Sequence, residues 1–430
     1  MNNKLIHGDS VKELNKFEDN SVDLLCTDPP YGYGFMGRDW DKVLPDIKIF
    51  EECFRVLKPG SMAFVMSAPR SDVQYRMAEM LEKVGFRIDY TPIYWTYASG
   101  FPKAMNISKM IDKQKGAKRE VTGKGKAGAA FHKGKGVITG GFGNISDGTG
   151  TATTEWDEKN NPATDEAKKL DGSYAGFQPK PAVEVVIVAM KPLDKKGYLE
   201  QAQDNQKGIT WFDDCRIPFE ESDTPKGGYG AMDIGIGKPG ETQDYRKKKK
   251  ITMPDLRDVG KKSKEAIGID KLSYGQVENA ERLEYEQNTD GRFPANMLVS
   301  DKVLDDYSRY FSLDEWFSKN LKSLPEPVQQ TFPFMIVPKA SRSEKDNGLD
   351  RNIHPTVKPL TLMNYLVTLG SRKGDVVLEP FAGSGTTALA CVGQERDYIA
   401  IEREQEYYEI AKARLEKVEE PLKLWEKFSG

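Results

Sequence analysis

Apolar residues recur in two patterns over the first hundred positions of the chain. Continuous apolar runs, such as residues 22–27 and 62–66, predict buried strands. Spacings of three and four residues over 47–57 and 73–84 predict helices that each bury one face. Gly85 stands where the second of these helices should end. Because strands alternate with helices, this region favours an α/β fold with a mostly parallel sheet.

Smaller signals fill in the same region. Ser10 is placed to cap a short helix that follows it. Pro59-Gly60 should end the helix predicted over 47–57. The β-branched and aromatic residues of 86–97 predict one or two strands.

The middle of the chain breaks this rhythm. Eleven glycines fall between residues 101 and 150, so 101–175 is interpreted as loop. Residues 182–190 form one strongly apolar run and predict a strand. Residues 195–335 are polar and rich in Gly and Pro, and they are interpreted as a less regular inserted domain.

The α/β rhythm returns near residue 355. Helices are predicted over 359–369, 387–392 and 404–418, and strands over 376–378 and 398–401. The predicted organisation is therefore a first half-domain, a large insertion and a second half-domain. Their bounds are 1–100, 101–337 and 338–430, with 176–192 expected to contribute a strand to the core sheet.

Charge adds one regional feature. The chain has 430 residues and a formal net charge of −3, which argues against an overall basic surface. Residues 101–140, however, hold ten Lys or Arg against two Asp or Glu, and 246–250 is a second basic cluster. A local basic groove is therefore compatible with the composition.

The cysteines and the N-terminus indicate where the protein works and which kinds of site it lacks. The four cysteines are widely scattered without a Cys-x-x-Cys pair, so we expect neither a metal centre nor a disulfide framework. The N-terminus lacks an apolar signal core, and no apolar run is long enough to span a bilayer. We therefore expect a cytoplasmic protein that has no membrane partner.

A glycine turn, Gly383-Ser384-Gly385, follows the predicted strand over 376–378. The glycines allow unusual backbone angles and let a ligand approach the main chain. Glu402 ends the next strand, 17 residues after Gly385, at a spacing suited to accepting hydrogen bonds from ribose hydroxyls. The turn therefore suits a nucleoside-like cofactor. The alternative is a tight strand–helix turn with Glu402 in solvent.

The segment Asp28-Pro29-Pro30-Tyr31 follows the first predicted strand. A carboxylate and the Pro29 carbonyl can both accept hydrogen bonds from an amine on a flat ring, which frees the nitrogen lone pair. The prolines stiffen the loop and fix the direction of these acceptors. The ring of Tyr31 offers a face for stacking a base. The alternative is a rigid turn with a buried tyrosine.

These segments resemble the β group of amino-group DNA methyltransferases, in which Asp-Pro-Pro-Tyr precedes a target recognition region and the cofactor motif comes last. The resemblance covers about half the chain. It implies a Rossmann-like S-adenosylmethionine-dependent sheet of seven strands with one antiparallel strand, circularly permuted, with an inserted target recognition region. It also implies that the target base flips into the site. Asp rather than Ser at position 28 resembles the adenine-specific enzymes.

The resemblance assigns roles residue by residue. Asp28, Pro29, Pro30 and Tyr31 are the catalytic set. Asp9, in Ile6-His7-Gly8-Asp9-Ser10, matches the acid that contacts the cofactor adenine. His354-Pro355-Thr356-Val357-Lys358-Pro359 is similar to the segment before the helix that closes the methionine pocket. Glu379 stands where Asp is common. The implied cofactor residues are Asp9, Thr356, Lys358, Glu379, Phe381, Gly383, Gly385, Thr386 and Glu402.

For the DNA side, the basic residues of the insertion are predicted to lie near phosphates of double-stranded DNA. They are Lys113, Lys115, Lys118, Arg119, Lys124 and Lys126. The alternative is a solvated basic loop. The resemblance leaves open a homodimer and a cognate restriction enzyme as partners.

Several other activities compete. Methylation of cytosine at carbon 5 needs a cysteine nucleophile, and none of the four follows a proline. A zinc deaminase needs His-x-Glu and Pro-Cys-x-x-Cys, which are absent. Methylation of the cytosine N4 amine, an RNA methyltransferase and a non-catalytic DNA-binding module stay open. The preferred hypothesis is a site-specific DNA methyltransferase that modifies the N6 amine of adenine.

Overall fold

The computed structural model describes residues 3–32, 41–97, 104–124, 158–177, 179, 182–219, 291–300, 304–321 and 357–429. The chain divides into two compact units, one made of Met1–Pro218 with Arg292–Gly430 and one of Phe219–Gly291. Every described helix and strand belongs to the first unit.

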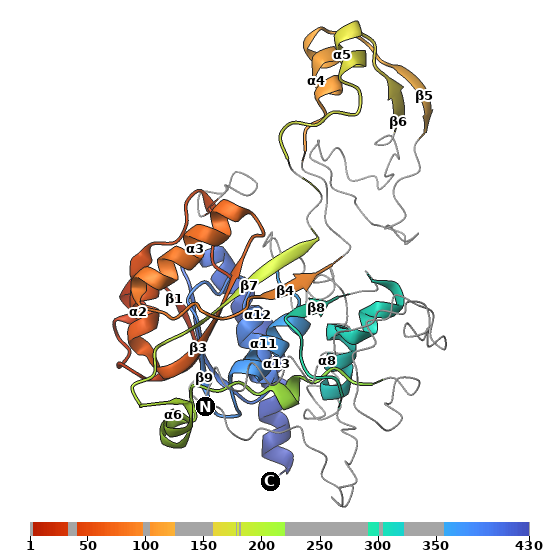
Figure 1. The fold of residues 1–430 in the computed structure, drawn as a ribbon. Helices are drawn as coiled ribbons and strands as arrows, with labels where there is room; N and C mark the ends of the chain where they lie inside the picture. Colours follow the sequence, from red (N-terminus) through yellow and green to blue (C-terminus); the bar gives the residue numbers. More distant parts are fainter. Residues whose placement is uncertain are drawn as a thin grey trace, which may run out of the picture. The chain divides into compact units, whose positions relative to one another are not determined.

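The described elements follow the predicted alternation in both halves of the chain (Figure 1). In chain order they are β1 (Lys4–His7), α1 (Ser10–Leu14), β2 (Val22–Thr27), α2 (Ile47–Val56), β3 (Leu57–Ser67), α3 (Ser71–Val84), β4 (Ile93–Thr96), α4 (Ile107–Gln114), β5 (Glu120–Lys124), β6 (Glu158–Asn161), α5 (Asp165–Lys169), β7 (Val183–Met190), α6 (Tyr198–Asn205), η4 (Phe212–Cys215), β8 (Met297–Val299), η6 (Asp305–Tyr310), α8 (Leu313–Leu321), α11 (Leu360–Gly370), β9 (Val376–Glu379), α12 (Thr386–Gly393), β10 (Asp397–Glu402) and α13 (Gln405–Ser429).

One large sheet organises the molecule. Its strand order is β1-β10-β9-β2-β3-β7-β4-β8, and β7 alone runs antiparallel to its two neighbours. This confirms the predicted α/β sheet with one antiparallel strand. The described residues contain eight strands in this sheet rather than seven, because the three-residue β8 pairs with the outer side of β4. Circular permutation stays a prediction.

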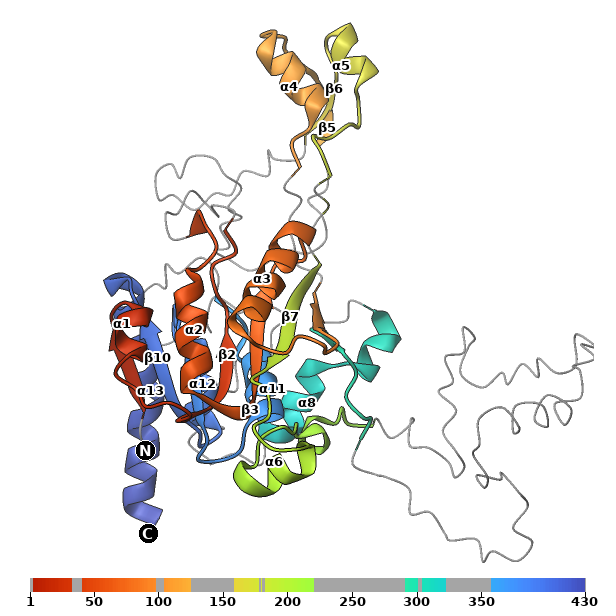
Figure 2. The same ribbon diagram turned by 60° about the vertical axis from the view of Figure 1, so that its left-hand side comes forward.

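Helices cover both faces of the sheet (Figure 1 and Figure 2). Alternate residues of β2 show why: Leu24 and Cys26 pack in the core beneath α11 and α12, whereas Leu25 packs in the core beneath α1, α2 and α3. Side chains of a strand point alternately to opposite faces, so a strand covered on both sides must be apolar throughout. The continuous apolar run over 22–27 has this cause.

Several local predictions were wrong. Asp9, not Ser10, is the N-cap of α1, because its carboxylate accepts a hydrogen bond from the Lys12 amide. Pro59-Gly60 does not end α2. The helix ends at Val56, and both residues lie inside β3. β3 begins at Leu57, directly after the helix, and pairs in parallel with β2, so Pro59-Gly60 lies within a strand.

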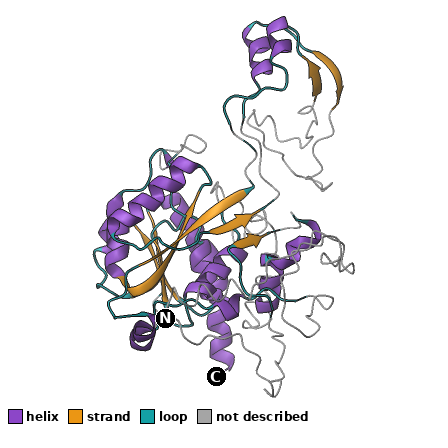
Figure 3. Cartoon of the chain, viewed as in Figure 1, coloured by secondary structure: helices purple, strands orange, loops and turns teal. Residues whose placement is uncertain are grey.

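The region interpreted as loop over 101–175 also needs correction. Its described residues form two helices, α4 and α5, and a two-stranded ribbon of β5 and β6 (Figure 3). Asp112, nearly fully buried, accepts hydrogen bonds from the amides of Ala163 and Thr164 and from the Arg119 guanidinium. This module is therefore held by a polar centre, which an apolar pattern cannot reveal.

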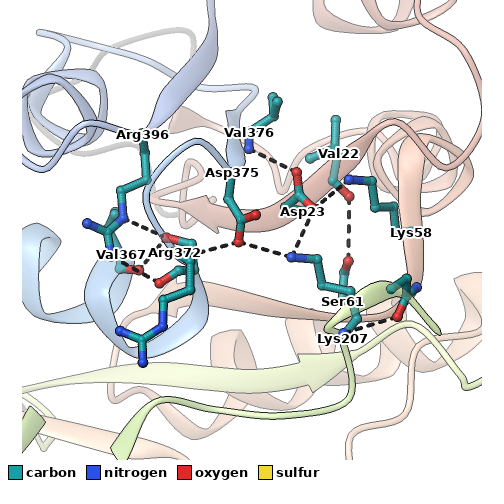
Figure 4. Close-up of polar contacts among 12 residues, drawn as sticks. Val22, Asp23, Lys58, Ser61, Lys207, Val367, Arg372, Asp375, Val376 and Arg396 are labelled. Carbon is teal, nitrogen blue, oxygen red and sulfur yellow. Dashed lines mark hydrogen bonds and ion pairs between the residues drawn. The ribbon is translucent and has the colours of Figure 1, made fainter. Parts of the chain in front are cut away.

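A charged cluster lies where the parallel strands β2, β3 and β9 begin (Figure 4). Lys207 Nζ lies 2.9 Å from Asp23 Oδ1 and 3.0 Å from Asp375 Oδ2, and Lys58 Nζ lies 2.6 Å from Asp23 Oδ1. Burial favours a raised pKa, but Lys207 and Lys58 hold the pKa of Asp23 below its ordinary value. These four residues, here called the amino-edge cluster, join the segment after α6 to the sheet.

Among the described residues, no helix is both long and apolar enough to cross a bilayer. The same part of the chain contains no group of three or more His, Cys, Asp or Glu side chains placed to hold a metal ion.

Candidate functional site

The predicted catalytic and cofactor segments meet at one edge of the sheet. β2 and β9 are adjacent parallel strands, so Asp28 and the glycine turn both follow strand ends at the same edge. The hydroxyl of Thr27 donates a 2.5 Å hydrogen bond to Glu379, which ties the two strand ends together. Open parallel sheets bind ligands at this edge.

Asp28 is held by two side chains from different parts of the chain. The Tyr31 hydroxyl donates to Asp28 Oδ1 at 2.8 Å, and Lys358 Nζ donates to Asp28 Oδ2 at 2.6 Å. Lys358 also lies 3.3 Å from Glu184 Oε2 on β7. Asp28, Glu184 and Lys358 are called the carboxyl-edge cluster below. A carboxylate offers about four acceptor sites, so Asp28 can accept further hydrogen bonds.

Opposing effects set the protonation of this cluster. Burial raises the pKa of Asp28 above its ordinary value, although Lys358 opposes the rise. Burial would lower the pKa of Lys358, but the carboxylates of Asp28 and Glu184 raise it above its ordinary value. Lys358 therefore stays a cation and favours the ionised, acceptor form of Asp28.

The loop after Asp28 is fixed by Asp41. One carboxylate oxygen of Asp41 accepts from the amides of Tyr31 at 2.8 Å and Gly32 at 3.0 Å. Gly32 has a φ of +73°, and a Cβ there would lie 2.7 Å from the Leu44 amide nitrogen. Lys358 Nζ lies 5.4 Å from the Tyr31 ring centroid. Both the edge and one face of this ring are therefore held in place.

The first glycine of the turn is held by the acid predicted to accompany it. The Gly383 amide donates to Glu402 Oε2 at 2.7 Å, and the Glu404 amide donates to Glu402 Oε1 at 2.8 Å. Gly383 has a φ of +53°. Burial raises the pKa of Glu402, and the backbone amides of Glu404 and Gly383 oppose the rise. Glu402 thus shapes the turn and keeps lone pairs for a ligand.

The second glycine serves the packing of a helix. Gly385 has a φ of +78°, and a Cβ there would lie 3.0 Å from Ala411 Cβ on α13. Thr386, the first residue of α12, accepts a hydrogen bond from buried Arg414 at 3.3 Å, and Arg414 also donates to the Ser384 carbonyl. Ala411 and Arg414 of α13 therefore hold the glycine turn in place.

Glu379 joins three elements. It accepts hydrogen bonds from the hydroxyls of Thr27 and Thr387 and from the Phe381 amide. Burial raises its pKa to about 8. The Phe381 ring lies 6.2 Å from that of Phe50 on α2. Both predicted residues therefore help to position the turn.

Asp9 also reaches this edge. β1 pairs with β10, and His7 is in register with Glu402. The Ser10 hydroxyl donates to the Pro380 carbonyl at 2.6 Å, which anchors the segment after β1 to the turn. Asp9 follows β1 and Glu402 ends the adjacent β10, and Glu402 bonds the turn that leads into α12. Two acceptors for amine or hydroxyl groups beside a main-chain donor region fit a nucleoside that carries a carboxylate.

Sequence reasoning missed Glu184 and Asp41. Glu184 is the single charged residue in the apolar run of β7, and this exception could have drawn attention to it. Asp41 carries no comparable signal. Of the predicted cofactor residues, Thr356 lies outside the described residues. Lys358 directly precedes Pro359 and α11, and its ammonium donates a hydrogen bond to Asp28.

The predicted DNA contacts fall in the α4–α5 module. Lys113, Lys115 and Lys118 are exposed, and Lys115 is paired with Glu166. The Arg119 side chain is largely buried and bound to Asp112, so its charge serves the module's interior. Lys126 and the Lys124 side chain, like the basic cluster over 246–250, lie outside the described residues.

Two curated relatives share parts of the sequence. The chain is 33% identical over 115 residues to the type II methyltransferase M2.MboI of Moraxella bovis, and 32% identical over 100 residues to the type II methyltransferase M.HinfI of Haemophilus influenzae. The matches cover 27% and 23% of this chain. They span 41% and 28% of the relatives, which is less than half the length of either.

Solved structures give a weaker likeness. The M1.HpyAVI–SAM complex is 15% identical with a TM-score of 0.39, over 96% of this chain and 98% of that one. The cytosine-N4-specific PvuII DNA methyltransferase is 14% identical with a TM-score of 0.40, over 98% and 92%. Scores of this size carry no argument about function.

A family match covers more of the chain than either relative does. Residues 178–413, more than half of the chain, match the family N6_N4_Mtase, described as DNA methylase. The matched region contains Glu184, Lys358 and the glycine turn, all of which contribute to the edge built above. This chain belongs to the DNA methylase family.

Proposed function

We propose that this protein transfers a methyl group from S-adenosylmethionine to the exocyclic N6 amine of adenine in double-stranded DNA. The observation that carries the proposal is the half-buried carboxylate of Asp28, fixed by Tyr31 and Lys358 next to the glycine turn. Family membership supports a methyltransferase of amino groups in DNA. The identity of the base rests on Asp at position 28, which resembles the adenine enzymes.

S-adenosylmethionine supplies a methyl group on a positively charged sulfur. Asp9, Glu402 and the N-terminus of α12 are the groups proposed to hold it. Asp28 would accept one amine hydrogen and the Pro29 carbonyl the other, which frees the nitrogen lone pair. Among the described residues, none donates a hydrogen bond to the Pro29 carbonyl. Prealigned acceptors of this kind cost no reorganisation when the reaction occurs.

The decisive experiment identifies the modified base. DNA from cells that express the protein is digested to nucleosides and analysed by mass spectrometry, with cells carrying an empty vector as the control. N6-methyladenine is the expected product. N4-methylcytosine would retain the amine chemistry but replace the base. No modified base in DNA, with methylated nucleosides in RNA instead, would overturn the proposal.

The DNA contact can be tested on the α4–α5 module. Lys113 and Lys118 are exposed and are proposed to neutralise phosphates. Replacing each with Gln should reduce the slope of log affinity against log salt by about one for each phosphate that is no longer neutralised. Lys168→Gln on α5 removes the same charge from a residue paired with Asp165 and is the matched control. An unchanged slope in both Lys113→Gln and Lys118→Gln would remove these residues from the DNA surface.

A homodimer and a cognate restriction enzyme are further proposals about partners.

A further inference from the structure

Glu184 is a charged residue in a strand that should carry none. It is the second residue of β7, and the six residues from Val185 to Met190 are all buried. β7 lies inside the sheet between β3 and β4, where an unpaired carboxylate would be costly. Because β7 is antiparallel to its neighbours, its first residues lie at the same edge as Asp28.

Donors from two other segments reach Glu184, and a further hydroxyl, which donates to Asp28, lies near it. Lys358 Nζ lies 3.3 Å from Oε2, the Tyr97 hydroxyl donates to Oε1 at 3.4 Å, and the Tyr31 hydroxyl lies 3.5 Å from Oε2. Glu184 therefore accepts from one ammonium and one hydroxyl, which is the role of a carboxylate. Lys358 is therefore shared between two carboxylates, those of Asp28 and Glu184.

The charge of this arrangement is its main consequence. One ammonium and two carboxylates leave the carboxyl-edge cluster with one net negative charge. With Lys358 and Asp28 alone, the cluster would be neutral. We infer that Glu184 is a positioning residue that shares Lys358 with Asp28 and thereby keeps a net negative charge where the target amine docks.

This inference rests on the proposed function and explains why a negative charge is needed. As the amine nitrogen bonds the methyl carbon, the electron pair of the broken carbon–sulfur bond stays on sulfur. Positive charge moves to the nitrogen, which returns to neutrality by losing one of its own protons to water. A net negative cluster stabilises that charge where it develops, whereas a neutral pair does so far less.

Removing the charge of Glu184 should leave a signature in pH dependence. The titratable groups that face Asp28 are Tyr31, Lys358 and Glu184, with Cys26 from β2 and Glu379 from the neighbouring strand β9. Glu184 is a like charge that raises the pKa of Asp28. Glu184→Gln should therefore move the acid limb of the rate profile to lower pH while the plateau rate falls. General structural damage would lower the plateau without moving the limb.

The first measurement is the pH profile of kcat for Glu184→Gln. We expect the plateau to fall by about tenfold to a hundredfold. Glu200→Gln removes the same charge from an exposed site on α6 and is the matched control. Glu184→Asp keeps the charge and should keep the wild-type limb. An Asp variant that behaves like the Gln variant would overturn the inference.

The second measurement does not depend on turnover. Sinefungin carries an ammonium group near the position of the sulfonium methyl, and S-adenosylhomocysteine is neutral there. The wild-type protein should prefer the cationic ligand, and Glu184→Gln should reduce the ratio of the two Kd values by about fivefold to tenfold in calorimetric titrations without DNA. An unchanged ratio would refute a role for charge.

The outcomes separate the two proposals. A wild-type protein that methylates no DNA defeats the proposed function. A wild-type protein that methylates DNA, beside a Glu184→Gln variant with an unmoved limb and ratio, defeats the role of Glu184 alone. Should Glu184→Gln fail to fold, Tyr97→Phe takes its place. Loss of a donor strengthens the field of Glu184, so the limb should move to higher pH, and an unmoved limb would count against the inference.

Discussion

The two edges of the central sheet each carry a partly buried charged cluster, and the two clusters differ in the balance of their charges. The amino-edge cluster joins Asp23 and Asp375 to Lys58 and Lys207, so two carboxylates meet two ammonium groups. The carboxyl-edge cluster has two carboxylates and one ammonium.

The pKa shifts follow this difference. The pKa of Asp23 lies below its ordinary value because its lysines outweigh burial. The pKa of Asp28 lies above its ordinary value because burial and Glu184 outweigh Lys358. A cluster that only stabilises the fold is satisfied internally, whereas a cluster that must act on a ligand keeps charge and acceptor capacity in reserve.

The largest expected effect is the loss of activity in Asp28→Asn. The change removes a charged acceptor and should lower kcat by about a thousandfold or more. Lys358 would still be paired with Glu184, so the free energy of unfolding should change by less than about 1 kcal/mol. Rate assays, cofactor titration and urea unfolding together test this. Retained turnover, or lost cofactor binding, would remove Asp28 from its proposed role. Asp194→Asn, at an exposed site, is the control.

The converse result is expected from Lys207→Met at the other edge. Lys207 is 6% exposed, and its loss leaves Asp23 with Lys58 alone and takes the ammonium group from Asp375. We expect a loss of about 2–4 kcal/mol in urea unfolding, with kcat near the wild-type value where the variant is folded.

A surface lysine provides the comparison for that variant. Lys195→Met removes an exposed ion pair from the same segment and should cost less than about 0.5 kcal/mol. Equal losses in the two lysine variants would show that the amino-edge cluster contributes no more to stability than a surface pair does.

Sequence patterns predicted local elements better than they predicted contacts between distant segments. The apolar run over 22–27 marked β2 with its observed bounds, and the glycine turn marked the start of α12, because both signals are local. The pairing of Lys358 with Glu184 is not local. It arises because the chain returns to the same sheet edge from a distant strand, and only the strand order brings the two residues together.

Buried polar side chains that organise a module were also not predicted from the sequence. The α4–α5 module is organised around Asp112, which binds Thr164 and Arg119. In the sequence Thr164 carries no signal of this contact, and Arg119 was predicted to lie near DNA phosphates. The cap of α1 was also mispredicted, because Asp9 and Ser10 are adjacent and both are suitable caps. Asp9 caps the helix, and the hydroxyl of Ser10 instead bonds Pro380 across 370 residues. Hydrogen bonds between distant segments leave no periodic signal.

The smallest expected effect is a difference in the pH at which the protein loses activity and the pH at which it unfolds. Activity needs ionised Asp28, so it should be lost as pH falls through a folded pKa that lies above 3.8. The pKa of Asp23 in the folded protein is lowered. Its contribution to the free energy of unfolding is therefore present above pH 3.8 and is lost only as pH falls below that value. Glu379, with a folded pKa near 8, supports the fold in acid and loses its contribution as pH rises through 8.

A pH range should therefore exist in which the protein is folded and inactive. Rate profiles and far-UV circular dichroism, recorded over the same acid titration, measure the two transitions side by side. The rate should fall first and recover when the sample is returned to neutral pH. If both signals instead fell together, acid would be acting on the fold, and the carboxyl-edge cluster would not be distinguished from the amino-edge cluster by its protonation.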